Sequence, residues 1–169
     1  MDTMDAIHTR RSVRRYEDRQ VPEELRRKLL AAAMSAPSAR NGQPWQFVVI
    51  DDRGTLAEIA RLNPNAQMCR EAPLAILVCG DLGLEKSPGY WVVDCAAAVE
   101  NMLLAAHALG LGAVWTGVYP RPERMEGLGK LLKLPENVIP HSLVVVGYPA
   151  EQPPPQDRYR PERVHHGGW

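Results

Sequence analysis

The segment APSARNGQPW, residues 36–45, is the most informative part of this sequence. Its proline, serine, asparagine and glycine residues predict an irregular loop between a helix and an apolar strand. The loop offers a hydroxyl at Ser38 and side-chain amides at Asn41 and Gln43. An amide presents a donor and an acceptor together, as a heterocycle with N–H and C=O edges requires. Ordinary turn formation explains the same residues, so both interpretations stay open at this point.

Helices and short strands follow one another irregularly on both sides of this loop. Apolar spacing and breaker residues predict helices over 2–8, 22–36, 55–62, 91–109 and 123–132, and strands over 45–50, 74–79, 113–115 and 142–146. Strict alternation of strand and helix is absent, which favours the α+β class. The strand over 74–79 is apolar throughout and is therefore expected to be central.

The dipeptide Thr116-Gly117 comes just past the third predicted strand. A glycine there would let a ligand approach backbone N–H groups closely. The nearby Gly110-Leu111-Gly112 follows a helix and precedes a strand, which is the reverse of the order in a Rossmann dinucleotide loop. We therefore reject a Rossmann site and keep Thr116 and Gly117 as candidate ligand contacts.

Composition limits the class of protein. The 169 residues suit one domain over 1–169, and the 20 basic and 20 acidic residues cancel. Zero net charge argues against a dedicated nucleic-acid binder. The 13 glycines and 15 prolines are an excess for a small domain. Many of these prolines fall in the charged segment over about 150–169, which cannot form a core and is expected to be an extended arm.

The sequence also predicts a reduced, non-membrane setting. Three cysteines form no CxxC pair, and the charged first 16 residues do not resemble a signal peptide. No apolar run approaches the roughly 18 residues that a membrane span needs. The chain is therefore expected to be cytoplasmic and not membrane-bound. The five histidines show no metal-ligand spacing, so no metal site is expected, and neither a P-loop nor a GxSxG motif occurs.

A basic run near the N-terminus is the second positive signal. Arg10, Arg11 and Arg14 lie within five residues of one another, with Ser12 among them. Guanidinium groups match phosphate oxygens, and a hydroxyl adds one more donor. Arg158 could join the same phosphate if the arm folds back. A merely solvated basic face is an equally good interpretation of the composition.

Together these pieces resemble the FMN-dependent nitroreductase family, in its small single-domain branch. The resemblance follows the chain in order: Arg-Arg-Ser-x-Arg-x-Tyr at 10–16, the loop at 36–45, Asp94 and Asn101 in an alanine-rich helix, Gly-Leu-Gly-Ala-Val-Trp-Thr-Gly at 110–117, Gly147-Tyr148-Pro149, Asp157-Arg158-Tyr159 and Val164-His165. The loop is the most specific piece. The resemblance implies a mainly antiparallel central sheet flanked by helices, with a C-terminal arm reaching the partner subunit.

The resemblance also implies a homodimer with FMN at the subunit interface. The positions that match the family's flavin contacts are Arg10, Arg11, Ser12, Arg14, Pro37, Ser38, Ala39, Asn41, Gln43, Thr116, Gly117 and Arg158, with the loop residues supplied by the partner chain. Arg14 matches the basic residue beside the flavin N1 and O2, and Thr116 and Gly117 match the backbone near N5. Gly42 replaces a larger polar residue of many relatives, which could widen or loosen the loop.

The implied activity is an oxidoreductase that transfers hydride from NAD(P)H through flavin N5 to electron-poor acceptors such as nitroaromatics or quinones, by a ping-pong cycle. The flavin ring carries the redox chemistry, so no catalytic side chain is expected, and Arg14 tunes the ring. Tyr90 and Trp91 are candidates for the rim of the substrate pocket. Core packing at the start of a helix explains these two aromatic residues equally well.

Two other functions remain to be weighed. One is a flavin-binding storage or sensing protein with little reductase turnover. The other is a nucleic-acid binder using Arg10 to Arg15 and Arg40, which zero net charge makes a poor match. No ribose-reading acid and no 2′-phosphate clamp is recognisable, so the sequence favours neither NADH nor NADPH, and it does not single out one acceptor.

Overall fold

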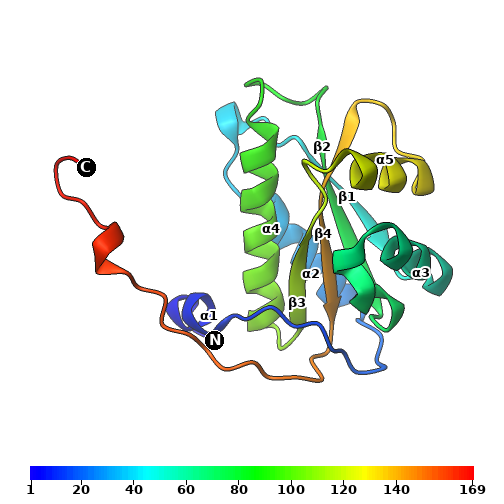
Figure 1. Ribbon diagram of the computed structural model, residues 1–169, viewed down its shortest axis with the longest axis horizontal. Helices are drawn as coiled ribbons and strands as arrows, with labels where there is room; N and C mark the ends of the chain where they lie inside the picture. The colour runs from blue at the N-terminus through cyan, green and yellow to red at the C-terminus, as the bar shows by residue number, and fades with distance from the viewer.

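A four-stranded antiparallel sheet forms the centre of the computed structural model, which describes residues 1–169 (Figure 1). The strands are β1 (Trp45–Ile50), β2 (Leu74–Asp81), β3 (Gly112–Gly117) and β4 (Val138–Gly147), in the order β1-β2-β4-β3. All three neighbouring pairs are antiparallel. The sheet with helices on its faces confirms the predicted α+β class.

Helices cover both faces of this sheet. They are α1 (Thr3–Thr9), α2 (Glu23–Met34), α3 (Arg53–Leu62), α4 (Trp91–Ala108) and α5 (Pro122–Leu131). α2 and α4 pack on one face, whereas α3, α5 and the 3-10 helix η2 (Pro64–Arg70) pack on the other. α1 is short and lies against α4.

The central strand β2 explains why the fold has two cores. Side chains alternate between the faces of a strand, so Leu74 and Ile76 face α4 while Ala75 and Leu77 face α3. All four are fully buried. An apolar residue is needed at every position of a strand that is covered on both faces, which confirms the prediction that the strand is central.

Element ends differ from the sequence-based expectation in several places. β4 runs over Val138–Gly147 and is longer than the expected 142–146, because it includes Pro140, a residue that does not signal a strand. β3 includes Thr116 and Gly117, which pair with Leu143 and Ser142 of β4, so the dipeptide lies inside the strand and not just past it. Glycine has low strand propensity, and only the pairing with β4 reveals the longer strand. The second helix ends at Met34, two residues before the expected Ala36.

The C-terminal segment leaves the body of the molecule as an extended arm (Figure 1). Its base is held by the bond from the Ala150 amide to the Arg15 carbonyl, 2.9 Å, and by a bond from the Arg11 guanidinium to the Pro154 carbonyl. Residues 154–169 are all exposed, and the hydrogen bonds of residues 155–169 lie within the arm. No helix in the molecule has both the length and the apolar character that crossing a bilayer demands.

Candidate functional site

The basic run lies along the free edge of β3. Ser12 forms a parallel bridge with Ala113, and the Val13 amide donates to the Ala113 carbonyl at 3.0 Å. Val13 is buried in the core on the α3 side of the sheet. Its burial fixes the positions of the residues on either side of it. The arginines at 10, 11 and 14 are thereby held beside the edge strand.

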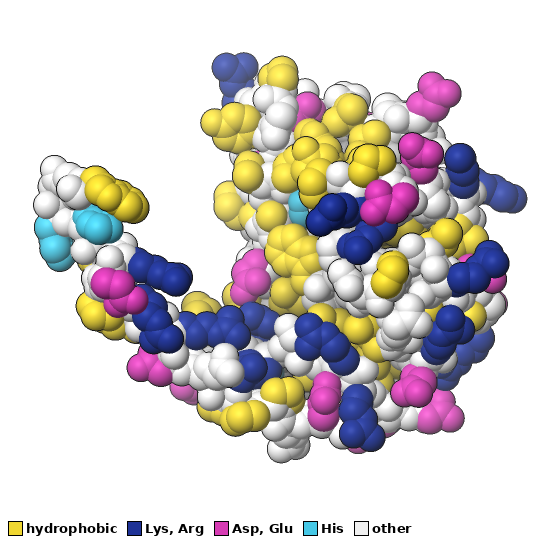
Figure 2. All heavy atoms as spheres, viewed as in Figure 1, with side chains coloured by type: hydrophobic (Ala, Val, Ile, Leu, Met, Phe, Trp, Pro, Cys, Tyr) yellow, Lys and Arg dark blue, Asp and Glu magenta, His cyan; other side chains and the backbone are white.

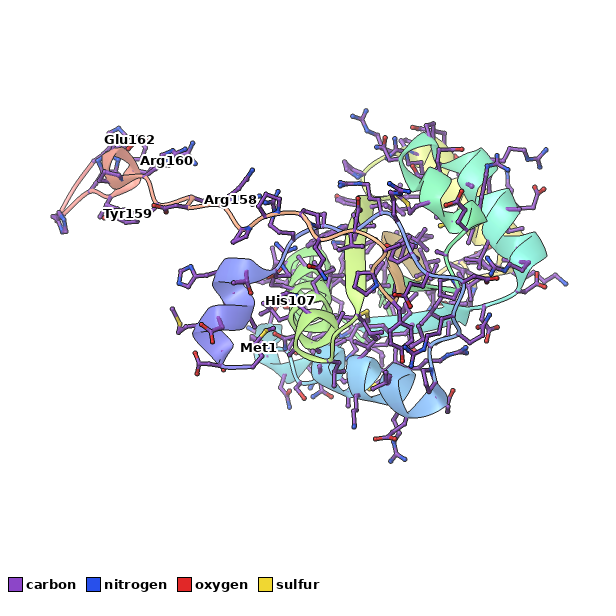
Figure 3. The ribbon with its side chains drawn as sticks, turned by 90° about the horizontal axis from the view of Figure 1, so that it is seen from below. Met1, His107, Arg158, Tyr159, Arg160 and Glu162 are labelled. Atoms are coloured by element: carbon purple, nitrogen blue, oxygen red, sulfur yellow. The ribbon has the colours of Figure 1, made fainter.

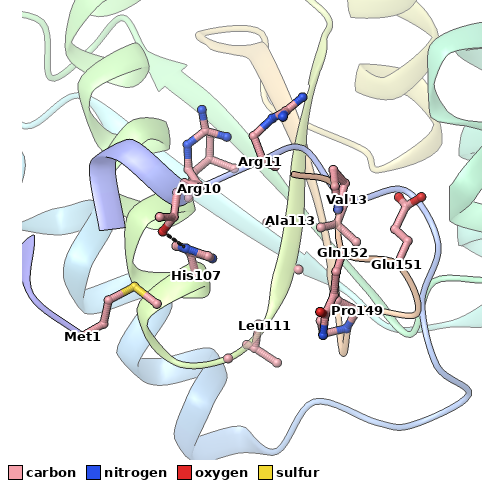
Figure 4. Close-up of a pocket in the computed structure, with 15 residues that line it drawn as sticks. Met1, Arg10, Arg11, Val13, His107, Leu111, Ala113, Pro149, Glu151 and Gln152 are labelled. Atoms are coloured by element: carbon pink, nitrogen blue, oxygen red, sulfur yellow. Dashed lines mark hydrogen bonds between the residues drawn. The ribbon is translucent and has the colours of Figure 1, made fainter. Parts of the chain in front are cut away.

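A cavity of about 370 Å³ opens at the C-terminal end of α4 (Figure 4). Arg10 and Arg11 line it together with His107 and the backbone at Gly110–Ala113. The Arg10 Nε atom is buried and has no hydrogen-bond partner, and it lies 3.7 Å from a Glu100 carboxylate oxygen. A buried N–H without a partner is costly, so the site suits an anionic oxygen that would accept from it.

His107, on the wall of this cavity, responds to the charge of Arg10. The Thr9 hydroxyl donates to the Asp5 carbonyl at 2.6 Å, so His107 Nε2, 2.8 Å away, donates to the Thr9 oxygen. Burial lowers the pKa of His107, and the Arg10 charge lowers it further. The shift by Arg10 reflects the positive potential in the cavity.

A second cavity of about 410 Å³ lies farther along the same edge. Arg14, the Thr116-Gly117 end of β3 and residues of η2 line it. The Thr116 hydroxyl is buried and donates to the Leu143 carbonyl at 3.1 Å, so its side chain is occupied by the fold. The structure therefore brings Arg14 together with Thr116 and Gly117, and the side chain of Thr116 is not free to contact a ligand in this cavity.

The loop over residues 37–44 is tightly folded. Arg40, Asn41 and Gln43 have φ values of 51°, 52° and 51°, in the left-handed region. The Gln43 amide donates to Ser38 Oγ at 3.0 Å, and the Gln43 side chain donates to Asn41 Oδ1 at 3.1 Å. The two predicted amides thus lie together.

Gly42 does not loosen this loop, contrary to the expectation from the sequence. A Cβ atom at Gly42 would stand 3.2 Å from the Ala39 carbonyl oxygen and 3.4 Å from that of Leu84. The loop therefore packs closely against the connection between β2 and α4, and the missing side chain leaves no gap.

The loop and the basic run lie at opposite ends of α4. The Ala39 amide donates to Asp94 Oδ1, 2.9 Å, in the first turn of the helix, whereas the basic cavity includes His107 in its last turn. At about 1.5 Å per residue, these two helix positions are roughly 20 Å apart. Within one chain, the loop and the arginines are therefore too far apart to contact the same part of a ligand.

Arg158 is also remote from the other predicted contacts of its own chain. It projects from the arm, beyond the body of the molecule (Figure 3), and its guanidinium bonds to Gln156 Oε1 at 3.3 Å. The predicted residues thus fall into three groups within one chain: the edge of β3, the loop and the arm.

The two aromatic candidates have different environments. Tyr90 is 55% exposed, whereas Trp91 is 8% exposed and packs edge-to-face against Tyr119, with ring centroids 5.1 Å apart. Core packing is therefore the role that the structure gives Trp91 within one chain. Tyr90 stays available at the surface.

Sequence reasoning missed Trp115 and Tyr119, which flank the Thr116-Gly117 dipeptide and are both partly exposed. The buried His141 lies between them, with its ring centroid 5.9 Å from that of Trp115 and 6.3 Å from that of Tyr119. The sequence did offer a signal for these residues, because two aromatic residues lie within five positions around the candidate ligand contact Thr116-Gly117.

Comparisons with known proteins identify similar sequences and folds. The chain matches the nitroreductase family profile over residues 7–67 and 56–148. A Methanothermobacter thermautotrophicus protein, provisionally named NADH dehydrogenase/NAD(P)H nitroreductase, is 53% identical over 169 residues, covering 100% of this chain and 88% of that protein.

Solved structures show the same fold. A crystal structure from Parabacteroides distasonis with the same provisional name has a TM-score of 0.95 and 45% identity, covering 99% of this chain and 98% of that one. A provisionally named nitroreductase from Desulfovibrio desulfuricans, solved in complex with FMN, has a TM-score of 0.86 and 33% identity, covering 100% of this chain and 98% of that one. These similarities confirm the predicted nitroreductase-like fold.

Proposed function

The chain belongs to the nitroreductase family, and on that premise we propose that it binds FMN and uses it to oxidise NAD(P)H and reduce electron-poor acceptors such as nitroaromatics or quinones. One observation carries the proposal. A cavity with a partnerless buried arginine N–H adjoins, along the same strand edge, a second cavity with Arg14 and the end of β3.

The residues of the first cavity fit the phosphate of FMN. Arg10 offers its unpartnered Nε, and Arg11 adds a second guanidinium. Ser12 does not itself line this cavity, but it lies between Arg11 and Val13, which do. It bridges to Ala113 of β3, so we propose its hydroxyl as a further donor at the edge of the cavity. Guanidinium donors and a hydroxyl are the groups that proteins use for phosphate oxygens. This set explains why a protein without net charge carries such a concentrated basic run.

The residues of the second cavity fit the flavin ring. Bound FMN would supply the redox chemistry, hydride transfer from NAD(P)H to an electron-poor acceptor. Arg14 lines this cavity. Beside the N1–O2 side of a bound flavin, its charge would stabilise the negative charge of the reduced ring. The backbone of Thr116 and Gly117 would orient the N5 side without offering a competing acid.

A homodimer would complete the site. The length of α4 separates the loop from the arginines, and a second chain is a simple way to bring both to one flavin. Exposed apolar side chains on α1, α2 and α4, namely Met4, Ile7, Met34 and Val93, offer a surface for that chain. Figure 2 shows hydrophobic side chains gathered on the side of the body that the arm overhangs. The partner would supply Pro37, Ser38, Ala39, Asn41 and Gln43.

The proposal is tested by purification and FMN titration. We expect a yellow protein, or a colourless one that gains flavin absorption bands on addition of FMN, and NAD(P)H oxidation that depends on a nitroaromatic or quinone acceptor. A preparation that never binds FMN contradicts the proposal. Tight FMN binding with NAD(P)H oxidation no faster than that of free FMN would instead point to storage or sensing.

Replacing Arg14 with alanine is expected to lower the flavin midpoint potential by about 30 mV, since about 1.4 kcal/mol of stabilisation of the reduced, more negative flavin corresponds to that shift in a two-electron couple. The potential is measured by equilibration with a reference dye. Arg15→Ala is the matched control, because Arg15 is an equally charged and exposed neighbour that does not line the cavity. Equal potentials in the two variants would remove the role assigned to Arg14.

A further inference from the structure

A buried acid stands out on the mostly apolar helix α4. Asp94 is 6% exposed and is the one buried charged residue on that helix. Burial raises the pKa of the neighbouring Cys95 thiol, and the charges of Cys79 and of the Asp94 carboxylate raise it further. A buried carboxylate is costly unless it accepts hydrogen bonds, so its partner indicates why it is there.

The partner of Asp94 lies in the loop over residues 37–44. The Ala39 amide donates to Asp94 Oδ1 at 2.9 Å. Ala39 begins a 3-10 turn, Ala39–Asn41, and an amide at the start of such a turn has no acceptor within it. The carboxylate therefore satisfies a donor that the loop cannot satisfy, and its charge strengthens the bond.

The loop depends on outside support because its conformation is unfavourable. Arg40, Asn41 and Gln43 all adopt left-handed backbone, which L-residues occupy at a cost unless the surroundings hold them there. The amides of Asn41, Gly42 and Gln43 bond within the loop, to Ser38 and Ala39. The Ala39 amide, by contrast, bonds to another element, so Asp94 ties the loop backbone to α4.

A second polar residue of α4 holds the chain just before the loop. Asn101, two turns after Asp94 on the same face of the helix, donates from Nδ2 to the Ala32 carbonyl at 3.1 Å. Ala32 lies in the last turn of α2. α4 therefore fixes both the entry to the loop and its first turn.

We propose that Asp94 is a positioning residue. Through its hydrogen bond with the Ala39 amide, it holds the loop over residues 37–44 in the conformation that contacts the flavin of the partner subunit. The inference rests on the proposed function for its link to FMN. The support of the loop by Asp94 does not depend on FMN, because it is inferred from a hydrogen bond within one chain.

The experiment measures amide hydrogen exchange of the peptide over residues 36–44 and the rate of FMN dissociation, on the protein as purified. In Asp94→Ala we expect exchange in this peptide and FMN dissociation to rise about tenfold each, the change that loss of one charge-assisted bond of about 1.4 kcal/mol produces. Asp94→Asn keeps an acceptor oxygen and is expected to stay within about twofold of the wild type.

Asp52→Ala is the matched control, because the Asp52 carboxylate accepts the Thr55 amide at 2.7 Å at the start of α3, away from the loop. We expect it to leave both rates unchanged. Unchanged loop exchange in Asp94→Ala, or equal effects of Asp94→Ala and Asp94→Asn, would overturn the inference. Faster loop exchange with unchanged FMN release would overturn the link to the flavin. A wild type that binds no FMN would contradict the proposed function, while loop exchange would still decide the role of Asp94.

Discussion

A chain truncated after Gln152 is expected to lose FMN and to be monomeric at concentrations where we expect the full chain to be a yellow dimer. Residues 154–169 make almost no contact with their own chain and are all exposed. The arm nevertheless carries Tyr159, Val164 and Trp169, large apolar side chains that gain stability only by burial against something else. In the proposed dimer that surface belongs to the partner.

The expected effect is large because the arm combines residue types that dominate interfaces. Tyrosine, tryptophan and arginine side chains buried at the centre of an interface contribute about 2 kcal/mol or more each. Loss of two such anchors raises the dimer dissociation constant about a thousandfold. Loss of Arg158 removes one proposed phosphate contact as well, so we expect FMN to dissociate with the dimer.

Analytical ultracentrifugation and the flavin spectrum measure the two effects. A truncation after Val164 is the control, since it removes Trp169 but keeps Tyr159 and Arg158, and we expect an intermediate dissociation constant with FMN retained. Should the chain truncated after Gln152 remain dimeric and yellow, the arm is not part of the interface.

The second large effect concerns pH and the buried His141. Burial lowers the pKa of His141 from its ordinary 6.5 to about 4, against a smaller opposing contribution from a hydrogen bond with the backbone of Val92. Between these values the unfolded chain binds a proton that the folded chain does not. The free energy of unfolding therefore falls as the pH falls from about 6.5 to about 4, by about 3 kcal/mol in total.

Urea unfolding at pH 7 and at pH 4.5, for the wild type and for His141→Gln, measures this contribution. Glutamine keeps a polar group beside Ser142, whose hydroxyl lies 2.6 Å from the histidine ring, but it does not titrate. The variant is expected to lose less stability between the two pH values. His165→Gln, in the exposed arm, is expected to behave as the wild type. Equal pH dependence in the wild type and His141→Gln would show that His141 does not titrate differently on folding.

The central part of the fold was predictable because burial on both faces of a sheet leaves a direct signature. An uninterrupted apolar run such as 74–79 is expected in a strand that is covered on both faces of the sheet. The structure places this run in β2, between β1 and β4, and buries it. The end of β3 was not predictable, since Thr116 and Gly117 join the strand through pairing with residues about 25 positions away. Local propensity carries no information on such pairing.

The candidate site was predictable in part for a similar reason. Arg14, Thr116 and Gly117 line one cavity because Ser12 and Val13 pair with Ala113 at the edge of β3. The family resemblance matched these residues to one flavin, but local patterns do not reveal the pairing that brings them together. Tyr90 is exposed whereas Trp91 is buried. This difference depends on the direction in which the chain enters α4, and two adjacent aromatic residues in a sequence do not reveal that direction. Asp94 was recognisable in the sequence as an acid in a mostly apolar helix. Its hydrogen-bond partner, the Ala39 amide, is identified only by the structure of the loop.

The length of α4 has a genetic consequence for the proposed dimer. Each chain would give its basic run to one site and its loop to the other, because the helix holds these groups at opposite ends. A chain defective only at Arg10 and a chain defective only at Asn41 would then complement each other. In the mixed dimer one site would inherit both defects and the other neither, so two inactive alleles would together restore one working site in two.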